Sequence, residues 1–196
     1  MPGKTFEPIA PEAIVIGVSA GGLKALSAIL PTLPANYPLP IMTVIHLPPD
    51  RKSIVAPLFQ EKCALTVVEA EDKVPIKPGT VYFAPPDYHL MVEPHRVLSL
   101  SSEEPVLYSR PSVDVLFETA ADAYGEGLIG VILTGASDDG AAGLKAVLAA
   151  GGTGLIETPE DAYATAMPEA ARQLNPEAHI MSLEQIARYL QKAVQS

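Results

Sequence analysis

Short, continuous apolar runs separated by helix-like segments recur along most of this 196-residue chain and constrain its fold more than any other feature. Strands that are covered on both faces in a parallel sheet carry such runs, whereas half-exposed strands alternate apolar and polar residues. The runs are AIVIGV (13–18), IMTVIH (41–46), LTVVEA (65–70), VYFA (81–84), LIGVILT (128–134), TGLIE (153–157) and HIMSL (179–183). Because strands that alternate with helices pair in parallel through right-handed crossovers, the pattern predicts a doubly wound α/β fold: a mostly parallel, Rossmann-like sheet with helices on both faces.

Two of the intervening segments have clear helical periodicity. The first is predicted to start at an N-cap, Ser112, and to bury the stripe Val113, Leu116, Phe117, Ala120 and Tyr124. The second starts with a capping-box pair, Ser182 and Gln185, and is predicted to bury Leu183, Ile186, Ala187, Leu190 and Val194. One stretch breaks the alternation: HLMVEPHRVLSL (89–100) has two strand-like runs around a polar turn and predicts a β-hairpin.

Length and composition favour one globular domain, residues 13–196, after an N-terminal tail of residues 1–12. Hydrophobic residues make up 48% of the chain and charged residues 18%. The formal net charge of −10 and the lack of any Lys/Arg cluster argue against nucleic acid as a partner. No apolar run approaches the length of a membrane span, the N-terminus lacks a signal-peptide core, and the single cysteine, Cys63, cannot form an internal disulfide. These features predict a cytoplasmic protein that does not insert into membranes.

Polar side chains follow three of the predicted strands. Ser19 follows the first, His46 ends the second, and Asp138 and Asp139 follow the LIGVILT strand. In an open parallel sheet the carboxyl ends of the strands converge on the ligand site, so these side chains are expected at one edge. Serine needs a neighbouring base to become a nucleophile, imidazole suits that task, and a carboxylate can hold the imidazole in position. The group therefore predicts an activated-serine hydrolase, with one of the two aspartates in the triad and the other capping the next helix.

The glycines around Ser19 spell G-x-S-x-G, the pattern of a sharp strand-to-helix turn that exposes a nucleophile. By itself this pattern is weak, because Ser19 can equally be a helix cap. A dinucleotide site would place glycine where Ser19 stands and an acidic residue where His46 stands, so both positions count against NAD. No P-loop motif occurs, and the histidines His46, His89, His95 and His179 lack metal-ligand spacing. We therefore expect no cofactor and no metal, and structural or surface roles for the last three histidines, with His89 the foremost exception.

Six stretches, taken together and in order, resemble the catalytic domain of CheB, the chemotaxis protein-glutamate methylesterase. They are VIGVSAGGLKAL, VIHLPP, APPDYHL, RPSVDVLF, LTGASDDGAAGL and AMPEAA, and they extend over roughly residues 13 to 190. The resemblance implies hydrolysis of glutamyl γ-methyl esters on chemoreceptors and deamidation of glutamines. It assigns the nucleophile to Ser19, the base to His46 and the third triad member to Asp139, leaving Asp138 at a variable position.

The same resemblance implies substrate contacts at Ala20, Gly21, Gly22 and Ala136. Ala20 stands where the family often has threonine, and Ala136 and Ser137 replace a methionine and a glycine, which puts substrate preference in question. The receiver domain of the common chemotaxis form is expected to be missing, so the regulatory partner is open. Three rival functions remain: an esterase for another substrate, a non-catalytic CheB-like binding module, and a nucleotide-binding domain.

Overall fold

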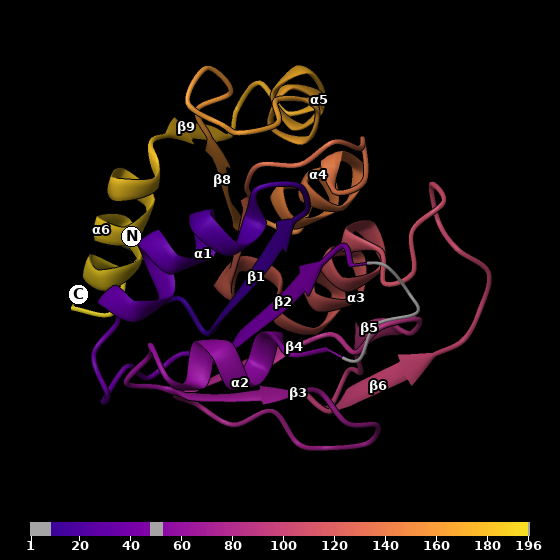
Figure 1. The fold of residues 1–196 in the computed structure, drawn as a ribbon, viewed down its shortest axis with the longest axis vertical. Helices are drawn as coiled ribbons and strands as arrows, with labels where there is room; N and C mark the ends of the chain where they lie inside the picture. The colour runs from indigo at the N-terminus through magenta and orange to yellow at the C-terminus, as the bar shows by residue number, and fades with distance from the viewer. Residues whose placement is uncertain (1–8, 48–52, 196) are drawn as a thin grey trace, which may run out of the picture.

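The computed structural model describes residues 9–47 and 53–195. Most of the expected N-terminal tail, and Pro48 and Pro49 of the VIHLPP motif, lie outside the described residues. Seven strands form one sheet, and every neighbouring pair in it is parallel. The strands are β1 (Ala13–Val18), β2 (Ile41–Ile45), β3 (Thr66–Glu69), β4 (Thr80–Phe83), β7 (Leu128–Ile132), β8 (Thr153–Glu157) and β9 (His179–Met181). The predicted doubly wound sheet is confirmed, and each predicted run overlaps one of these strands (Figure 1).

The strand order is β3-β4-β2-β1-β7-β8-β9, with β1 at the centre. The chain builds outward from β1 to one side through β2, then returns to the other side of β1 at β7. The chain adds strands on one side of β1 first and on its other side afterwards, so the direction of strand addition reverses next to β1. A crevice is expected at the carboxyl ends of the strands at such a reversal. Ser19, His46 and Asp139 follow β1, β2 and β7, the three adjacent central strands.

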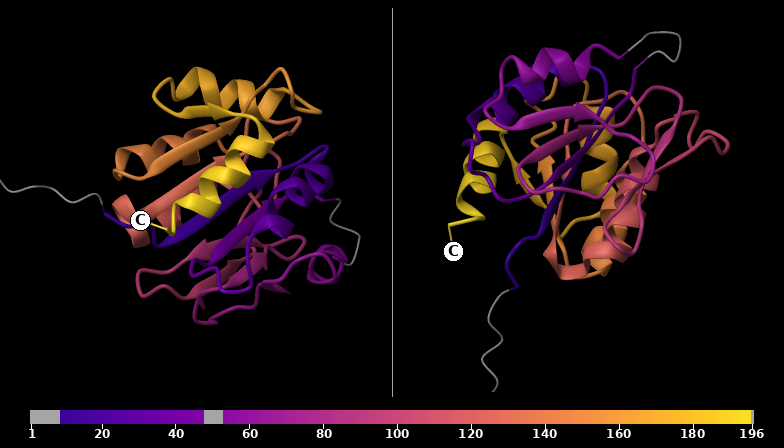
Figure 2. Two further views of the ribbon diagram at one scale, coloured as in Figure 1. Left: turned by 90° about the vertical axis from the view of Figure 1, so that its left-hand side faces the viewer. Right: turned by 90° about the horizontal axis from the view of Figure 1, so that it is seen from below.

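Helices cover both faces of the sheet, as the continuous apolar runs predict (Figure 2). Ile14 and Ile16 of β1 pack into one core, and Ala13 and Val15 into the other. The first core contains α1 (Gly22–Ile29), α2 (Val55–Gln60) and α6 (Leu183–Lys192), next to the short 3-10 turn η1 (Leu30–Thr32). The second contains α3 (Val113–Tyr124), α4 (Ala141–Ala149) and α5 (Ala166–Leu174), with η2 (Gly125–Gly127) leading from α3 into β7.

The structure also contains the hairpin, the buried helical stripe and the capping box that the sequence predicts. The hairpin consists of β5 (His89–Val92) and β6 (Leu98–Ser101), which pair antiparallel outside the main sheet. The predicted stripe of α3 is buried, and α6 begins with the reciprocal Ser182–Gln185 capping box. In α6, Ile186, Ala187 and Leu190 are buried and Leu183 is partly buried. The helix ends at Lys192, so Val194 of the predicted stripe lies beyond it, where it packs partly against the core.

Gly17 of β1 sets how closely α3 approaches the sheet. A Cβ atom at this position would overlap Cγ1 of Val113, the first residue of α3. The missing side chain therefore lets the N-terminus of α3 lie against the central strand, next to the carboxyl end that carries Ser19.

We expect Gly17→Ala to destabilise the fold by about 1–3 kcal/mol, because the added methyl group must displace Val113 or the strand. Urea denaturation measures this cost. Val113→Ala removes the clashing methyl groups, so the double variant should be more stable than the sum of the single costs by more than about 0.5 kcal/mol. Additive costs would show that Gly17 and Val113 are not in contact.

Candidate active site

Ser19 lies on a tight turn between β1 and α1, the geometry that the G-x-S-x-G pattern predicts. The Ser19 N–H donates to the Thr134 carbonyl after β7 at 2.9 Å, and the Ser19 carbonyl accepts from the Gly22 N–H at 2.9 Å. Gly21 has a φ of +80°, and a Cβ atom there would lie 2.6 Å from Tyr163 Cβ. Glycine is thus required at position 21 by its backbone conformation as well as by its neighbour. The turn is fixed from two sides and holds Ser19 at the carboxyl edge of the sheet.

His46 stands beside Ser19 on the neighbouring strand. In the parallel register Val18 is opposite Ile45, and the His46 N–H donates to the Val18 carbonyl at 3.1 Å. Because adjacent strands lie only about 4.8 Å apart, Ser19 and His46 lie next to each other just beyond the ends of these strands. The Ser19 hydroxyl makes no hydrogen bond within residues 9–47 and 53–195. Catalytic hydrogen bonds of this kind often tighten only when substrate binds.

Asp139 is paired with His46. Nε2 of His46 is 2.8 Å from Oδ2 of Asp139, and the Asp139 side chain is fully buried while that of His46 is 14% exposed. Asp138, the other candidate, is exposed. The contact occupies Nε2 and leaves Nδ1 as the ring nitrogen available for proton transfer.

The Asp139 carboxylate sits at the N-terminus of α3. Oδ1 accepts from the Ser112 hydroxyl at 2.8 Å and from the Asp114 N–H at 2.9 Å, and Oδ2 accepts from the Val113 N–H at 2.7 Å. Burial opposes ionisation, but the hydrogen bonds from His46, Asp114, Val113 and Ser112 together outweigh it and lower the pKa of Asp139. The carboxylate therefore stays charged and acts only as an acceptor towards His46.

Asp114 in turn accepts hydrogen bonds from the N-terminus of α4. Its Oδ1 accepts from the Gly140 N–H at 2.9 Å and from the Gly143 N–H at 2.6 Å, at the start of the helix that follows Asp139. Burial is the main reason that the pKa of Asp114 is raised to about 6, and the nearby charge of Asp139 adds to it. Asp139 thus caps α3, the helix that contains Asp114, and Asp114 caps α4, the helix that follows Asp139.

Of the other predicted site residues, Ala20 and Gly21 have backbone N–H groups with no acceptor in the described parts of the chain. The N–H of Gly22 is used by the Ser19 carbonyl, so Gly22 shapes the turn without offering a donor. Ala136 is exposed, and the Ser137 hydroxyl beside it accepts from the Asp139 N–H at 3.2 Å.

The sequence analysis does not predict a hydrogen-bond network beneath the Ser19 turn. The Thr134 hydroxyl donates to the Ala20 carbonyl at 2.8 Å, and the Thr134 N–H donates to Oε2 of buried Glu157 at 2.7 Å. Burial raises the pKa of Glu157. Ser112 was recognised only as a helix cap, and its contact with Asp139 joins segments 27 residues apart. No local pattern encodes contacts of this kind.

His89, the foremost exception among the other histidines, has a structural place. It is buried, its Nδ1 accepts from the Ser112 N–H at 3.1 Å, and its Nε2 lies 3.0 Å from the Glu104 carbonyl. It ties the hairpin to the N-terminus of α3. Among the described residues there is no group of three or more His, Cys, Asp or Glu side chains that could hold a metal ion, and no helix long and apolar enough to cross a membrane.

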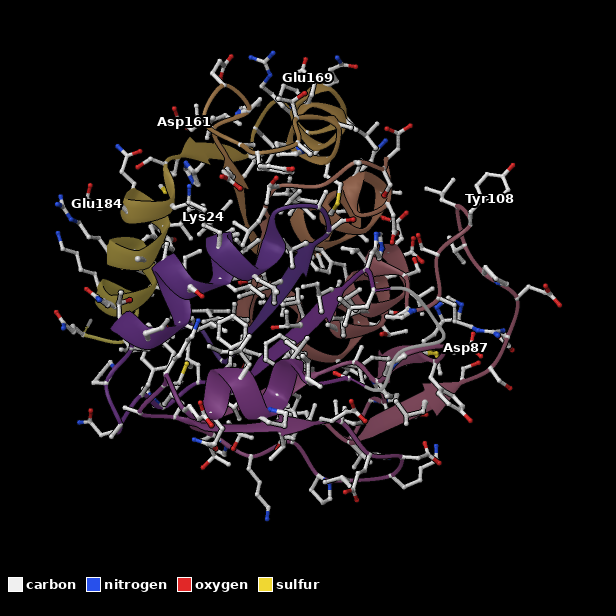
Figure 3. The ribbon with its side chains drawn as sticks, in the orientation of Figure 1. Lys24, Asp87, Tyr108, Asp161, Glu169 and Glu184 are labelled. Carbon is white, nitrogen blue, oxygen red and sulfur yellow. The ribbon has the colours of Figure 1, made fainter. Side chains whose placement is uncertain are left out.

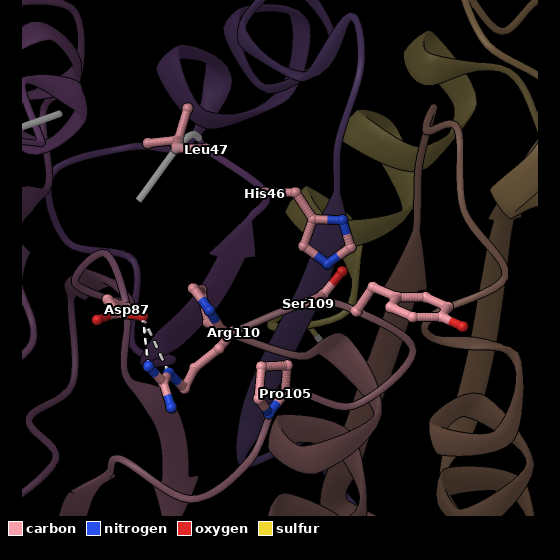
Figure 4. A pocket seen from close by; sticks show the side chains of 8 residues that line it. His46, Leu47, Asp87, Pro105, Ser109 and Arg110 are labelled. Atoms are coloured by element: carbon pink, nitrogen blue, oxygen red, sulfur yellow. Dashed lines mark hydrogen bonds and ion pairs between the residues drawn. The ribbon is translucent and has the colours of Figure 1, made fainter. Parts of the chain in front are cut away.

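A cavity of about 270 Å³ opens beside His46 (Figure 4). Its lining includes Leu47, Tyr108, Ser109 and Arg110. The Arg110 guanidinium is paired with Asp87, whose Oδ1 accepts from Nη2 at 2.6 Å and from Nε at 3.0 Å. A substrate side chain can therefore reach the histidine from solvent.

Comparison with known proteins bears on the assignment. The CheB methylesterase family model matches residues 14–190. This chain belongs to the CheB methylesterase family. The crystal structure of the Thermotoga maritima CheB methylesterase catalytic domain superposes with a TM-score of 0.88 at 35% identity, covering 94% of this chain and 99% of that one.

Curated relatives agree. A Leptospira interrogans protein is 47% identical over 176 residues, which cover 90% of this chain and 91% of the relative. The protein-glutamate methylesterase/protein-glutamine glutaminase 5 of Myxococcus xanthus is 36% identical over 200 residues, covering 98% of this chain and 58% of the relative. The family and the fold inferred from the sequence are thus confirmed.

Asp114→Asn tests the paired caps through the pH dependence of stability. Because the pKa of Asp114 is raised in the folded state, its protonation stabilises the fold at low pH, and this contribution is lost as the pH rises through about 6. Both N–H donors bind Oδ1, so asparagine can keep them without the charge. We expect the variant to lack ~1–3 kcal/mol of the fall in unfolding free energy between about pH 4 and pH 7. Urea denaturation across this range measures it.

Asp138→Asn is the matched control, because it removes an exposed carboxylate next to the same network. Its stability profile should follow the wild type. A wild-type profile for Asp114→Asn would contradict the raised pKa of Asp114 in the folded state.

Proposed function

We propose that this chain is a protein-glutamate methylesterase in which Ser19, His46 and Asp139 form the catalytic triad. The observation that carries the proposal is the 2.8 Å contact between His46 and a buried Asp139 that its hydrogen bonds keep ionised. A non-catalytic binding module has no need for a carboxylate so heavily supported at the far side of a histidine. Family membership and the relatives' names support the glutamyl ester as substrate.

The reaction begins when Nδ1 of His46 removes the proton of the Ser19 hydroxyl and Ser19 Oγ attacks the ester carbonyl. Asp139 holds Nε2 and stabilises the imidazolium that forms. The N–H groups of Ala20 and Gly21 are the donors left for the oxyanion, since those of Ser19 and Gly22 are already bonded. The intermediate collapses as His46 protonates the leaving group, and methanol departs.

A water molecule then attacks the glutamyl-enzyme ester, with His46 again as base, and releases the glutamate carboxylate and free Ser19. Glutamine deamidation follows the same course with ammonia as the leaving group, in keeping with the double name of the relatives. The proposed protein substrate is the methylated cytoplasmic domain of a chemoreceptor, so the proposed compartment is the cytoplasm.

Ser19→Ala removes the nucleophile while leaving the turn's backbone bonds in place. We expect methanol release from membranes carrying methylated chemoreceptors to fall at least about 10³-fold, with unchanged thermal stability. A fluorophosphonate probe should label the wild type at Ser19 and fail to label the variant. Near wild-type turnover in Ser19→Ala would exclude the proposed mechanism.

The two adjacent aspartates should differ sharply. Asp139→Asn keeps the size of the side chain but cannot hold His46 in the same tautomer, so kcat should drop about 10³–10⁴-fold. Asp138→Asn changes an exposed side chain and should stay within about threefold of wild type. Initial rates of methanol release distinguish the two variants. A larger loss of rate in Asp138→Asn would show that the assignment of the triad aspartate to Asp139 is wrong.

A further inference from the structure

A two-residue turn beside the active-site cavity has an unusual sequence for its conformation. Val106 and Ser109 exchange both backbone hydrogen bonds, at 3.0 and 2.8 Å, and the residues between them, Leu107 and Tyr108, have φ values of +48° and +65°. Turns with two positive φ angles are usually built from Asn-Gly, because larger side chains are strained there. Strained backbone of this kind tends to persist at sites where function maintains it.

The two side chains do not stabilise the fold in return. Leu107 is 51% exposed and Tyr108 is 102% exposed, so neither packs into the core. Tyr108 stands on a loop that projects from the body of the protein (Figure 3). Tyr108 also lines the cavity beside His46. An apolar tip is therefore exposed at the entrance to the proposed catalytic centre.

The base of this tip is held firmly. Nη1 of Arg110 donates to the carbonyls of Ser102 and Glu103 at 2.9 and 3.1 Å, while its other nitrogens bind Asp87. His89 contacts the next carbonyl, that of Glu104. These bonds hold the two ends of the loop to the hairpin and to α3. A surface that is ordered before binding loses less entropy when it binds.

Charge offers little attraction for an acidic protein at this entrance. Among the described residues that line the cavity, Arg110 is the one basic residue besides His46, and it is paired with Asp87. The chain as a whole carries a charge of −10. Contact affinity must therefore come mainly from apolar surface, and tyrosine supplies a large, rigid area for such contacts.

We propose that Leu107 and Tyr108 form an apolar docking tip for the polypeptide substrate, and that preferred substrates carry an apolar side chain close to the esterified glutamate. This inference rests on the proposed esterase function and adds substrate selection to it. The tip contacts the substrate chain beside the ester and leaves the reacting atoms to Ser19 and His46.

The double substitution Leu107→Asn and Tyr108→Gly tests the tip without disturbing the turn, because it installs the residues that this conformation prefers. Methanol release from methylated chemoreceptors gives KM and kcat for the protein substrate, and p-nitrophenyl acetate reports the triad alone. We expect KM for the protein substrate to rise about tenfold, the loss of one aromatic contact, while kcat and p-nitrophenyl acetate hydrolysis stay within about twofold. The melting temperature should stay the same or rise, as the strain is relieved.

Two controls separate the explanations. Tyr108→Phe keeps the ring and should retain the wild-type KM. Leu174→Gln removes an exposed apolar side chain at the end of α5, outside the cavity lining, and should also retain the wild-type KM. An unchanged KM in the double variant, or an equal loss on both substrates, would overturn the docking tip. If the wild type hydrolyses p-nitrophenyl acetate but no methylated protein, the proposed function fails first and the docking tip with it.

Discussion

The site depends on one buried interaction, the carboxylate of Asp139 seated on the N-terminus of α3. The N–H groups of Val113 and Asp114 and the Ser112 hydroxyl surround it, and His46 takes the remaining direction. Without those donors, burial would favour the neutral acid, which could not hold an imidazolium. The close approach of α3 to β1 that Gly17 permits is therefore an electrostatic requirement as well as a packing one.

The same helix N-termini separate the acid strengths of two neighbouring carboxylates. Asp139 receives three donors from the start of α3 and one contact from His46, and its pKa is lowered. Asp114 receives two backbone N–H groups from the start of α4, and its pKa is raised to about 6. Because two neighbouring negative charges repel each other, ionising both carboxylates is unfavourable. The carboxylate that accepts more hydrogen bonds stays ionised, and the pKa of the other is raised. The charge consequently remains on the residue that faces the histidine.

The sequence was most informative where a local pattern determines a local structure. Apolar runs located the strands, G-x-S-x-G located the Ser19 turn, and the family motif distinguished Asp139 from Asp138, in agreement with the burial of the one and the exposure of the other. It was least informative for contacts between distant segments, such as Ser112 with Asp139 and Thr134 with Ala20. The Leu107–Tyr108 turn was missed for another reason: its residues are the opposite of those that the conformation prefers, so turn chemistry gives no signal there.

The backbone donors around Ser19 explain why a strand–turn–helix outline shared with dinucleotide-binding folds suits ester chemistry here. A pyrophosphate needs several free N–H groups at the start of the helix. In this turn the Ser19 N–H is bonded to Thr134 and the Gly22 N–H to Ser19 itself, which leaves the adjacent N–H groups of Ala20 and Gly21. Two donors match one developing oxyanion better than they match two phosphates. The side chain at position 19 and the saturation of its backbone neighbours therefore favour the same chemistry, and His46 on the next strand supplies the base that this chemistry requires.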